Sequence, residues 1–226
     1  MREVVLDTET TGLDPDAGDR IVELGGVELL HHVPTGRSFH RYLNPQRDVP
    51  QEAVQVHGLT ATFLADKPLF AAVADEFLEF LGDARLVIHN AAFDVRFLNA
   101  ELGWAGRPAL AWGRAVDTLD LAKRRFPGAQ NSLDALCRRF GVDLTTRTKH
   151  GALLDSELLA EVYLELMGGR QPDLTLTVVT AGQRAAEIWV VPTRPRPLPP
   201  RLTEAELAAH ARFVAELGEE AVWLGR

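Results

Sequence analysis

At 226 residues, 46% hydrophobic and 25% charged, the chain can bury one sizeable core and carry an appendage. No run approaches the ~18 apolar residues of a membrane span, and a single cysteine excludes an internal disulfide, so we expect a cytoplasmic protein with no membrane partner. The net charge of −8 argues against tight binding to nucleic acid by this chain alone, because proteins that follow a phosphate backbone are usually basic.

Hydrophobic periods and turn residues predict an alternation of strands and helices over the first 170 residues. A β-meander comes first, with expected turns at Asp14-Pro15 and at residues 34–36. The predicted strands cover residues 3–9, 20–30, 36–43, 85–89 and 114–117. The predicted helices cover residues 68–81, 91–102, 118–125, 131–140 and 152–167, and a glycine pair ends the last one.

The composition changes after residue 170. Five prolines fall within residues 192–201, which predicts an extended, semi-rigid spacer. Thr203 and Glu206 have the spacing of a capping box, so we expect a helix from there to about Leu217. Because a short isolated amphipathic helix is only marginally stable in water, this one should dock, either on a partner or back on its own domain.

Four acidic residues lie where a folded chain normally places apolar ones. Asp7 and Glu9 are two positions apart on the first predicted strand, so both side chains leave the same face. At about 100° per residue, Asp94 and Asp155 project from the apolar faces of their predicted helices. Unpaired buried carboxylates are costly, and the sequence offers no matching set of inward lysines or arginines.

A hard divalent cation is the simplest way to compensate these charges. Oxygen ligands suit Mg²⁺ or Mn²⁺ better than zinc, and the single Cys137, expected in the core, cannot form a thiolate cluster. Taken singly, each residue also has a structural interpretation. Asp7 and Glu9 could form an exposed strand end, and Asp94 could cap its helix.

Three strings occur in order along the chain, VVLDTETTGL, LVIHNAAFD and RTKHGALLD, and they resemble the three motifs of the DEDD exonucleases of the histidine subtype. The segments between them, including VHG and FPGAQNSLDALC, resemble those of the proofreading 3′-5′ exonuclease (epsilon) subunits of bacterial DNA polymerase III. The likeness covers residues 1 to about 170. It implies an α/β fold of the ribonuclease H-like type, a mixed sheet flanked by helices, here followed by a C-terminal tail.

The resemblance assigns roles residue by residue. The catalytic general base would be His150, and two divalent ions, Mg²⁺ or Mn²⁺, would be held by Asp7, Glu9, Asp94 and Asp155. Substrate contacts would come from Asp7, Glu9, Glu52, His57 and Asp155. The implied activity is 3′-5′ exodeoxyribonuclease proofreading: two-metal hydrolysis of single-stranded or frayed 3′ DNA ends, which releases nucleoside monophosphates. Of the remaining histidines, His31, His32 and His40 are expected to be solvated.

Partners are also implied by the resemblance. The expected divisions are an exonuclease domain (1–170), a linker (171–201) and a helical segment that binds the polymerase III alpha subunit (202–226). In the linker, Gln171, Leu174 and Leu176 resemble the peptides that dock in the sliding clamp, although Leu176 replaces the more usual aromatic and a strand from Leu174 is an alternative. Two other functions stay open: an RNA-trimming 3′-5′ exonuclease, and a non-catalytic tether between polymerase and clamp.

Overall fold

The computed structural model describes residues 1–145, 147, 149–169 and 202–218. The chain divides into two units, residues 1–174 and 175–226. The predicted spacer and the predicted clamp-binding residues Gln171, Leu174 and Leu176 lie outside the described residues. Among the described helices, none combines the length and apolar character that a membrane crossing requires.

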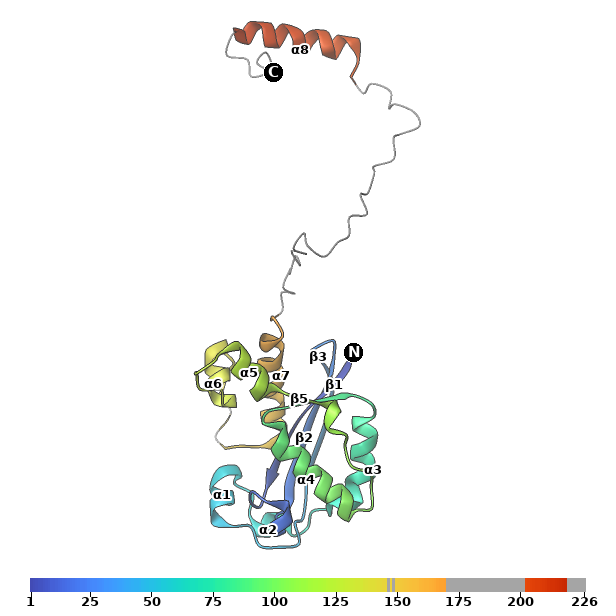
Figure 1. The fold of residues 1–226 in the computed structure, drawn as a ribbon, viewed down its shortest axis with the longest axis vertical. Coiled ribbons are helices and arrows are strands. Elements are labelled where there is room, and N and C mark those ends of the chain that lie inside the picture. The colour runs from blue at the N-terminus through green and yellow to red at the C-terminus, as the bar shows by residue number, and fades with distance from the viewer. Residues whose placement is uncertain (146, 148, 170–201, 219–226) are drawn as a thin grey trace, which may run out of the picture. The chain divides into compact units, whose positions relative to one another are not determined.

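The first unit is built on a five-stranded mixed sheet with the strand order β3-β2-β1-β4-β5 (Figure 1). The strands are β1 (Arg2–Thr10), β2 (Ile21–Leu30), β3 (Val33–Tyr42), β4 (Arg85–Ile88) and β5 (Ala115–Asp117). β2 pairs antiparallel with both β1 and β3, while β4 pairs parallel with both β1 and β5. The central strand β1 is therefore paired along both of its edges.

Helices cover the two faces of this sheet and confirm the predicted α/β architecture. The helices of this unit are α1 (Gln51–His57), α2 (Ala61–Leu64), α3 (Phe70–Leu81), α4 (Ala91–Trp104), α5 (Thr118–Arg125), α6 (Leu133–Phe140) and α7 (Ala152–Leu166). Val4 and Leu6 of β1 pack into a core with α3 and α4, whereas Val5 packs with Leu159 and Tyr163 of α7. Because side chains alternate along a strand, Asp7 and Glu9 continue the row of Val5, on the α7 side. The buried Cys137 joins a third cluster between α5, α6 and α7, as predicted.

The hairpin between β2 and β3 turns earlier than the sequence predicts. Its turn is at His31 and His32, with φ of 52° and 67°, and residues 34–36 lie inside β3. A positive φ is unusual for histidine, and each ring has a partner here: His31 Nδ1 lies 3.1 Å from the amino group of Met1, and His32 Nδ1 lies 2.7 Å from a carboxylate oxygen of buried Glu3. The expectation that His32 is merely solvated is therefore wrong, whereas His31 is exposed, as expected.

Two short helices, α1 and α2, were not predicted. With seven and four residues they are too short for a hydrophobic period, and α1 begins after Pro50 without a side-chain capping bond. α1 matters for the site because both Glu52 and His57 lie on it.

The second unit contains α8 (Glu204–Leu217), which confirms the predicted helix. The capping box is formed: the backbone N–H of Glu206 donates to Thr203 Oγ1 over 3.3 Å, and the backbone N–H of Thr203 donates to the Glu206 carboxylate over 2.7 Å. Three apolar side chains of this helix are exposed, Leu207, Phe213 and Leu217.

Candidate active site

The five predicted catalytic residues line one cavity of about 690 Å³ at the end of the sheet. Two of them come from β1, one from the first turn of α4, one from the first turn of α7, and one from the segment before α7. They are Asp7, Glu9, Asp94, Asp155 and His150. The structural interpretation of Asp7 and Glu9 as an exposed strand end is wrong, because Glu9 is buried and Asp7 is half-buried in this cavity wall.

The close approach of α7 to the sheet places Asp155 beside the β1 carboxylates. Gly25 of β2 is the register partner of Asp7, and a Cβ at Gly25 would lie only 2.1 Å from the carbonyl carbon of Ala152. Only glycine therefore lets the first turn of α7 rest on this strand. Ser156 secures the contact by donating from Oγ to the Gly25 carbonyl oxygen over 3.1 Å.

Asp94 reaches the cavity from the opposite face of the sheet. Its Oδ1 accepts a hydrogen bond from Thr8 Oγ1 over 2.7 Å, so the strand that carries Asp7 and Glu9 also orients Asp94. The start of α4 is fixed by Asp117, whose carboxylate accepts from the backbone N–H groups of Asn90 (3.2 Å) and Ala91 (3.1 Å). The alternative interpretation, that Asp94 caps its helix, is not supported, since α4 has no side-chain capping bond at its N-cap.

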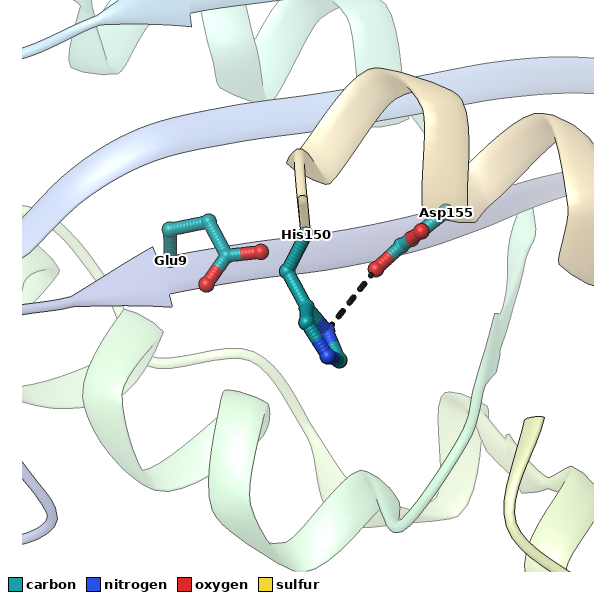
Figure 2. Close-up of side chains that lie close together, drawn as sticks. All are labelled: Glu9, His150 and Asp155. Carbon is teal, nitrogen blue, oxygen red and sulfur yellow. Dashed lines mark ion pairs between the residues drawn. The ribbon is translucent and has the colours of Figure 1, made fainter. Parts of the chain in front are cut away.

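Asp155 differs from the other three carboxylates because it is paired. Arg147 donates from Nε to Asp155 Oδ1 over 2.5 Å and from Nη2 to Asp155 Oδ2 over 2.7 Å. His150 Nδ1 lies 3.3 Å from Asp155 Oδ2, an ion pair drawn in Figure 2. The sequence offers no matching set of inward lysines or arginines, but one arginine, Arg147, does point into the site. Its loop position gives no hydrophobic period from which its direction could be predicted.

The surroundings of the other three carboxyl groups disfavour the ionised form. Burial, followed by repulsion from Asp94 and Glu9, raises the pKa of Asp7 well above its ordinary value. Burial, followed by repulsion from Asp155 and Glu23, raises the pKa of Glu9 to about 8. Burial also raises the pKa of Asp94 to about 7, against the opposing effect of its bond from Thr8. These shifts are typical of carboxylates placed to bind a cation.

Asp155 shows the opposite shift. Burial alone would raise its pKa, but the hydrogen bonds from His150 and Arg147 outweigh burial and hold the pKa below its ordinary value. Asp155 is thus ionised and paired, whereas Asp7, Glu9 and Asp94 have raised pKa values and form no ion pair within the described part of the chain.

One further buried carboxylate near Glu9, that of Glu23, was not among the predicted site residues. It lies directly across the β1–β2 ladder from Glu9, its side chain is 5% exposed, and His40 Nε2 lies 2.7 Å from Glu23 Oε1. The expectation that His40 is only solvated is therefore wrong. A signal existed, since Glu23 interrupts the apolar run IVELGGVELL, but linking it to Glu9 requires the hairpin register.

The predicted substrate residues Glu52 and His57 line an adjacent cavity of about 480 Å³. Glu9 and Phe93 line both cavities, so the two are neighbours. His57 is 6% exposed, and its Nδ1 accepts from the backbone N–H of Leu59 over 3.0 Å. Its buried Nε2 has no partner of good hydrogen-bonding geometry among the described residues, and burial lowers the pKa of the ring.

The donor set of the main cavity fits hard divalent cations. Its ligand atoms are carboxylate oxygens with one imidazole, and those of Glu9, His150 and Asp155 lie within 4.8 Å of one another (Figure 2). A cation here would relieve the repulsion that raises the pKa values of Asp7 and Glu9. The single cysteine is buried in another cluster and contributes no thiolate.

Comparison with known sequences points to one family. The family described as "Exonuclease" matches residues 4–163. DNA polymerase III subunit epsilon from Rickettsia conorii (strain ATCC VR-613 / Malish 7) is 56% identical over 174 residues, which cover 76% of each chain. The protein of the same name from Escherichia coli (strain K12) is 48% identical over 176 residues, which cover 75% of this chain and 72% of the relative. The epsilon subunit from Rickettsia prowazekii (strain Madrid E) is 46% identical over 96% of this chain and 97% of its own length.

Solved structures agree with the fold. Exonuclease X in complex with 5′ overhanging duplex DNA is 26% identical, with a TM-score of 0.57 over 73% of this chain and 90% of that one. The nuclease domain of 3′hExo, described as a DEDDh family member bound to rAMP, has a TM-score of 0.64 over 74% of this chain and 91% of that one. At 18% identity, the second likeness supports the fold alone.

Proposed function

The chain belongs to the exonuclease family and, within it, to the DNA polymerase III epsilon subunits, and on that premise we propose that the acidic cavity is its catalytic centre. Its function is 3′-5′ exonuclease proofreading: it removes mispaired nucleotides from the 3′ end of DNA during replication, as a polymerase III subunit. The observation that carries the proposal is that four carboxylates and one histidine, distant in sequence, line a single cavity.

Two divalent ions, Mg²⁺ or Mn²⁺, are the proposed cofactors, held by Asp7, Glu9, Asp94 and Asp155. When bound, such ions neutralise the phosphodiester charge and lower the pKa of water. The raised pKa values of Asp7, Glu9 and Asp94 support this assignment, because uncompensated carboxylates gain most from a cation.

Side chains of the protein supply proton transfer and substrate binding. His150 takes the proton of the attacking water; its half-exposed side chain can reach solvent, and an imidazole is the most common general base in enzymes. Asp155 orients that ring through its 3.3 Å contact to Nδ1. Glu52 and His57 bind the terminal nucleotide in the adjacent cavity, which both side chains line.

Further partners follow from the tail. We assign α8, with its exposed Leu207, Phe213 and Leu217, to the segment 202–226 that binds the polymerase alpha subunit, since a short helix with exposed apolar side chains needs a partner. Residues 1–170 form the nuclease domain and residues 171–201 the linker. Within the linker, Gln171, Leu174 and Leu176 are a proposed sliding-clamp peptide. A replicative role places the protein in the cytoplasm.

Primer digestion tests the function. The full-length protein with Mg²⁺ should release nucleoside monophosphates from a mismatched 3′ DNA end about tenfold faster than from a matched one, because a lost stacked pair is worth roughly 1.4 kcal/mol. An RNA strand of the same sequence tests the alternative function, that of an RNA-trimming 3′-5′ exonuclease. Equal or faster trimming of RNA would favour an RNA exonuclease, and no metal-dependent release from any strand would favour a non-catalytic tether.

A further inference from the structure

One cationic side chain lies inside the acidic cavity. Arg147 is 8% exposed, and its guanidinium makes four contacts there. Two are the donations to the two oxygens of Asp155, over 2.5 and 2.7 Å. Nη2 also lies 2.8 Å from His150 Nδ1, and Nη1 donates to Asp134 of α6. Arg147 therefore holds both Asp155 and His150, and it is anchored from a third direction by Asp134.

These contacts use the same atoms that the proposed function requires. Both Asp155 oxygens accept from Arg147, and the ligand atoms of Glu9, His150 and Asp155 lie within 4.8 Å of one another (Figure 2). A guanidinium and a divalent cation repel each other, so the two cannot both compensate one buried carboxylate at full strength. One must displace the other.

The partners of Asp94 and Asp155 differ in charge, so a cation would displace different groups at the two carboxylates. Asp94 is held by the neutral hydroxyl of Thr8, so a cation approaching Asp94 displaces no charged partner there. A cation approaching Asp155 must displace a bidentate, charge-assisted pair. Asp134 is 43% exposed and stays available to Arg147, so the guanidinium has a place to remain after it leaves Asp155.

We propose that Arg147 is a positioning residue of this active site: its guanidinium holds Asp155 and His150 in place and yields Asp155 when a divalent cation binds. This inference rests on the proposed function, since it requires Asp155 to be a metal ligand. It adds that cation binding at Asp155 is an exchange of one positive group for another. The exchange also frees His150 Nδ1 from its contact with Arg147.

The test measures cation binding rather than turnover. In the full-length protein, Arg147→Gln should bind Mg²⁺ about tenfold more tightly than the original chain in isothermal titration calorimetry, because the cation no longer displaces a charged hydrogen-bonded pair. Without metal, the variant should melt at a lower temperature, since Asp155 loses its compensation. Saturating Mg²⁺ should then raise its melting temperature by more than it raises that of the original chain. Arg147→Lys, which keeps the charge but not the fork geometry, should lie between the two.

A neighbouring arginine provides the matched control. Arg138 lies 3.6 Å from Asp134 but is 70% exposed, so Arg138→Gln removes the same charge without touching Asp155 and should leave Mg²⁺ affinity unchanged. Equal or weaker Mg²⁺ binding by folded Arg147→Gln, or by Arg147→Lys if the glutamine variant does not fold, would overturn the inference. If the original chain itself binds neither Mg²⁺ nor Mn²⁺, the proposed function fails and this inference fails with it.

Discussion

Replacing Asp7 with asparagine and Glu9 with glutamine should abolish metal-dependent nucleotide release while raising the melting temperature of the metal-free protein. Activity should fall by about four orders of magnitude, the scale seen when an essential member of a catalytic unit is removed. Stability should rise because burial and mutual repulsion raise the pKa values of both carboxyl groups, and the amides remove that repulsion at nearly constant shape. A purely structural pair would show the reverse, a loss of stability.

The matched control removes the same charge elsewhere. Asp75 and Glu76 are both exposed and form surface pairs with Arg107 and Arg41. Their double replacement by asparagine and glutamine should leave digestion of a mismatched primer intact and should not stabilise the protein, because surface ion pairs contribute little. Nuclease activity that survives in the Asp7/Glu9 variant would disprove the catalytic assignment. An unstable variant would disprove the electrostatic argument.

The metal-free protein should become less stable as the pH rises from 5 to 9. In the folded chain the pKa of Glu9 is raised to about 8 and that of Asp94 to about 7, whereas the unfolded values are about 4. Between these limits the folded state binds more protons than the unfolded state, so stability is lost as the pH rises through the folded pKa values. The loss should amount to several kcal/mol, or a decrease in melting temperature of roughly 10 °C for a chain of this length.

Mg²⁺ should reverse this trend, because ionised carboxylates bind the cation and protonated ones do not. Thermal melts in matched buffers measure how the melting temperature changes with pH, once with Mg²⁺ and once without it. The Asp7/Glu9 amide variant serves as the control for histidines and other groups that titrate in the same range. A metal-free melting temperature that rises between pH 6 and 9 in the original chain, relative to that variant, would contradict the raised pKa values.

The regular elements let the sequence predict most of the site. Asp7 and Glu9 follow from the two-residue period of a strand, and Asp94 and Asp155 follow from the helical period, so their common direction toward the interior could be derived. The structure confirms that all four line one cavity with His150. The resemblance to the three family motifs, which occur in the same order along the chain, then assigned a chemical role to each of these residues.

What the sequence did not predict depends on segments without a period. Arg147 lies in a loop, so nothing in the residue pattern indicates that it turns inward toward Asp155. Glu23 faces Glu9 because of the register of β1 against β2, which shifts between Glu9 and Thr10, and the predicted turn at Asp14-Pro15 does not by itself fix that register. The helix that carries Glu52 and His57 is too short to give a pattern. In each case tertiary contacts, not local preference, decide the conformation.

Counting bound Mn²⁺ ions by isothermal titration calorimetry, with a nucleoside monophosphate present, tests the central claim most directly. The full-length chain should bind two ions at the cavity formed by β1, α4 and α7, and Asp155→Asn and the Asp7/Glu9 amide variant should each lose at least one of them. If both variants bind Mn²⁺ with unchanged stoichiometry and affinity, these carboxylates do not hold the metals and the account is wrong.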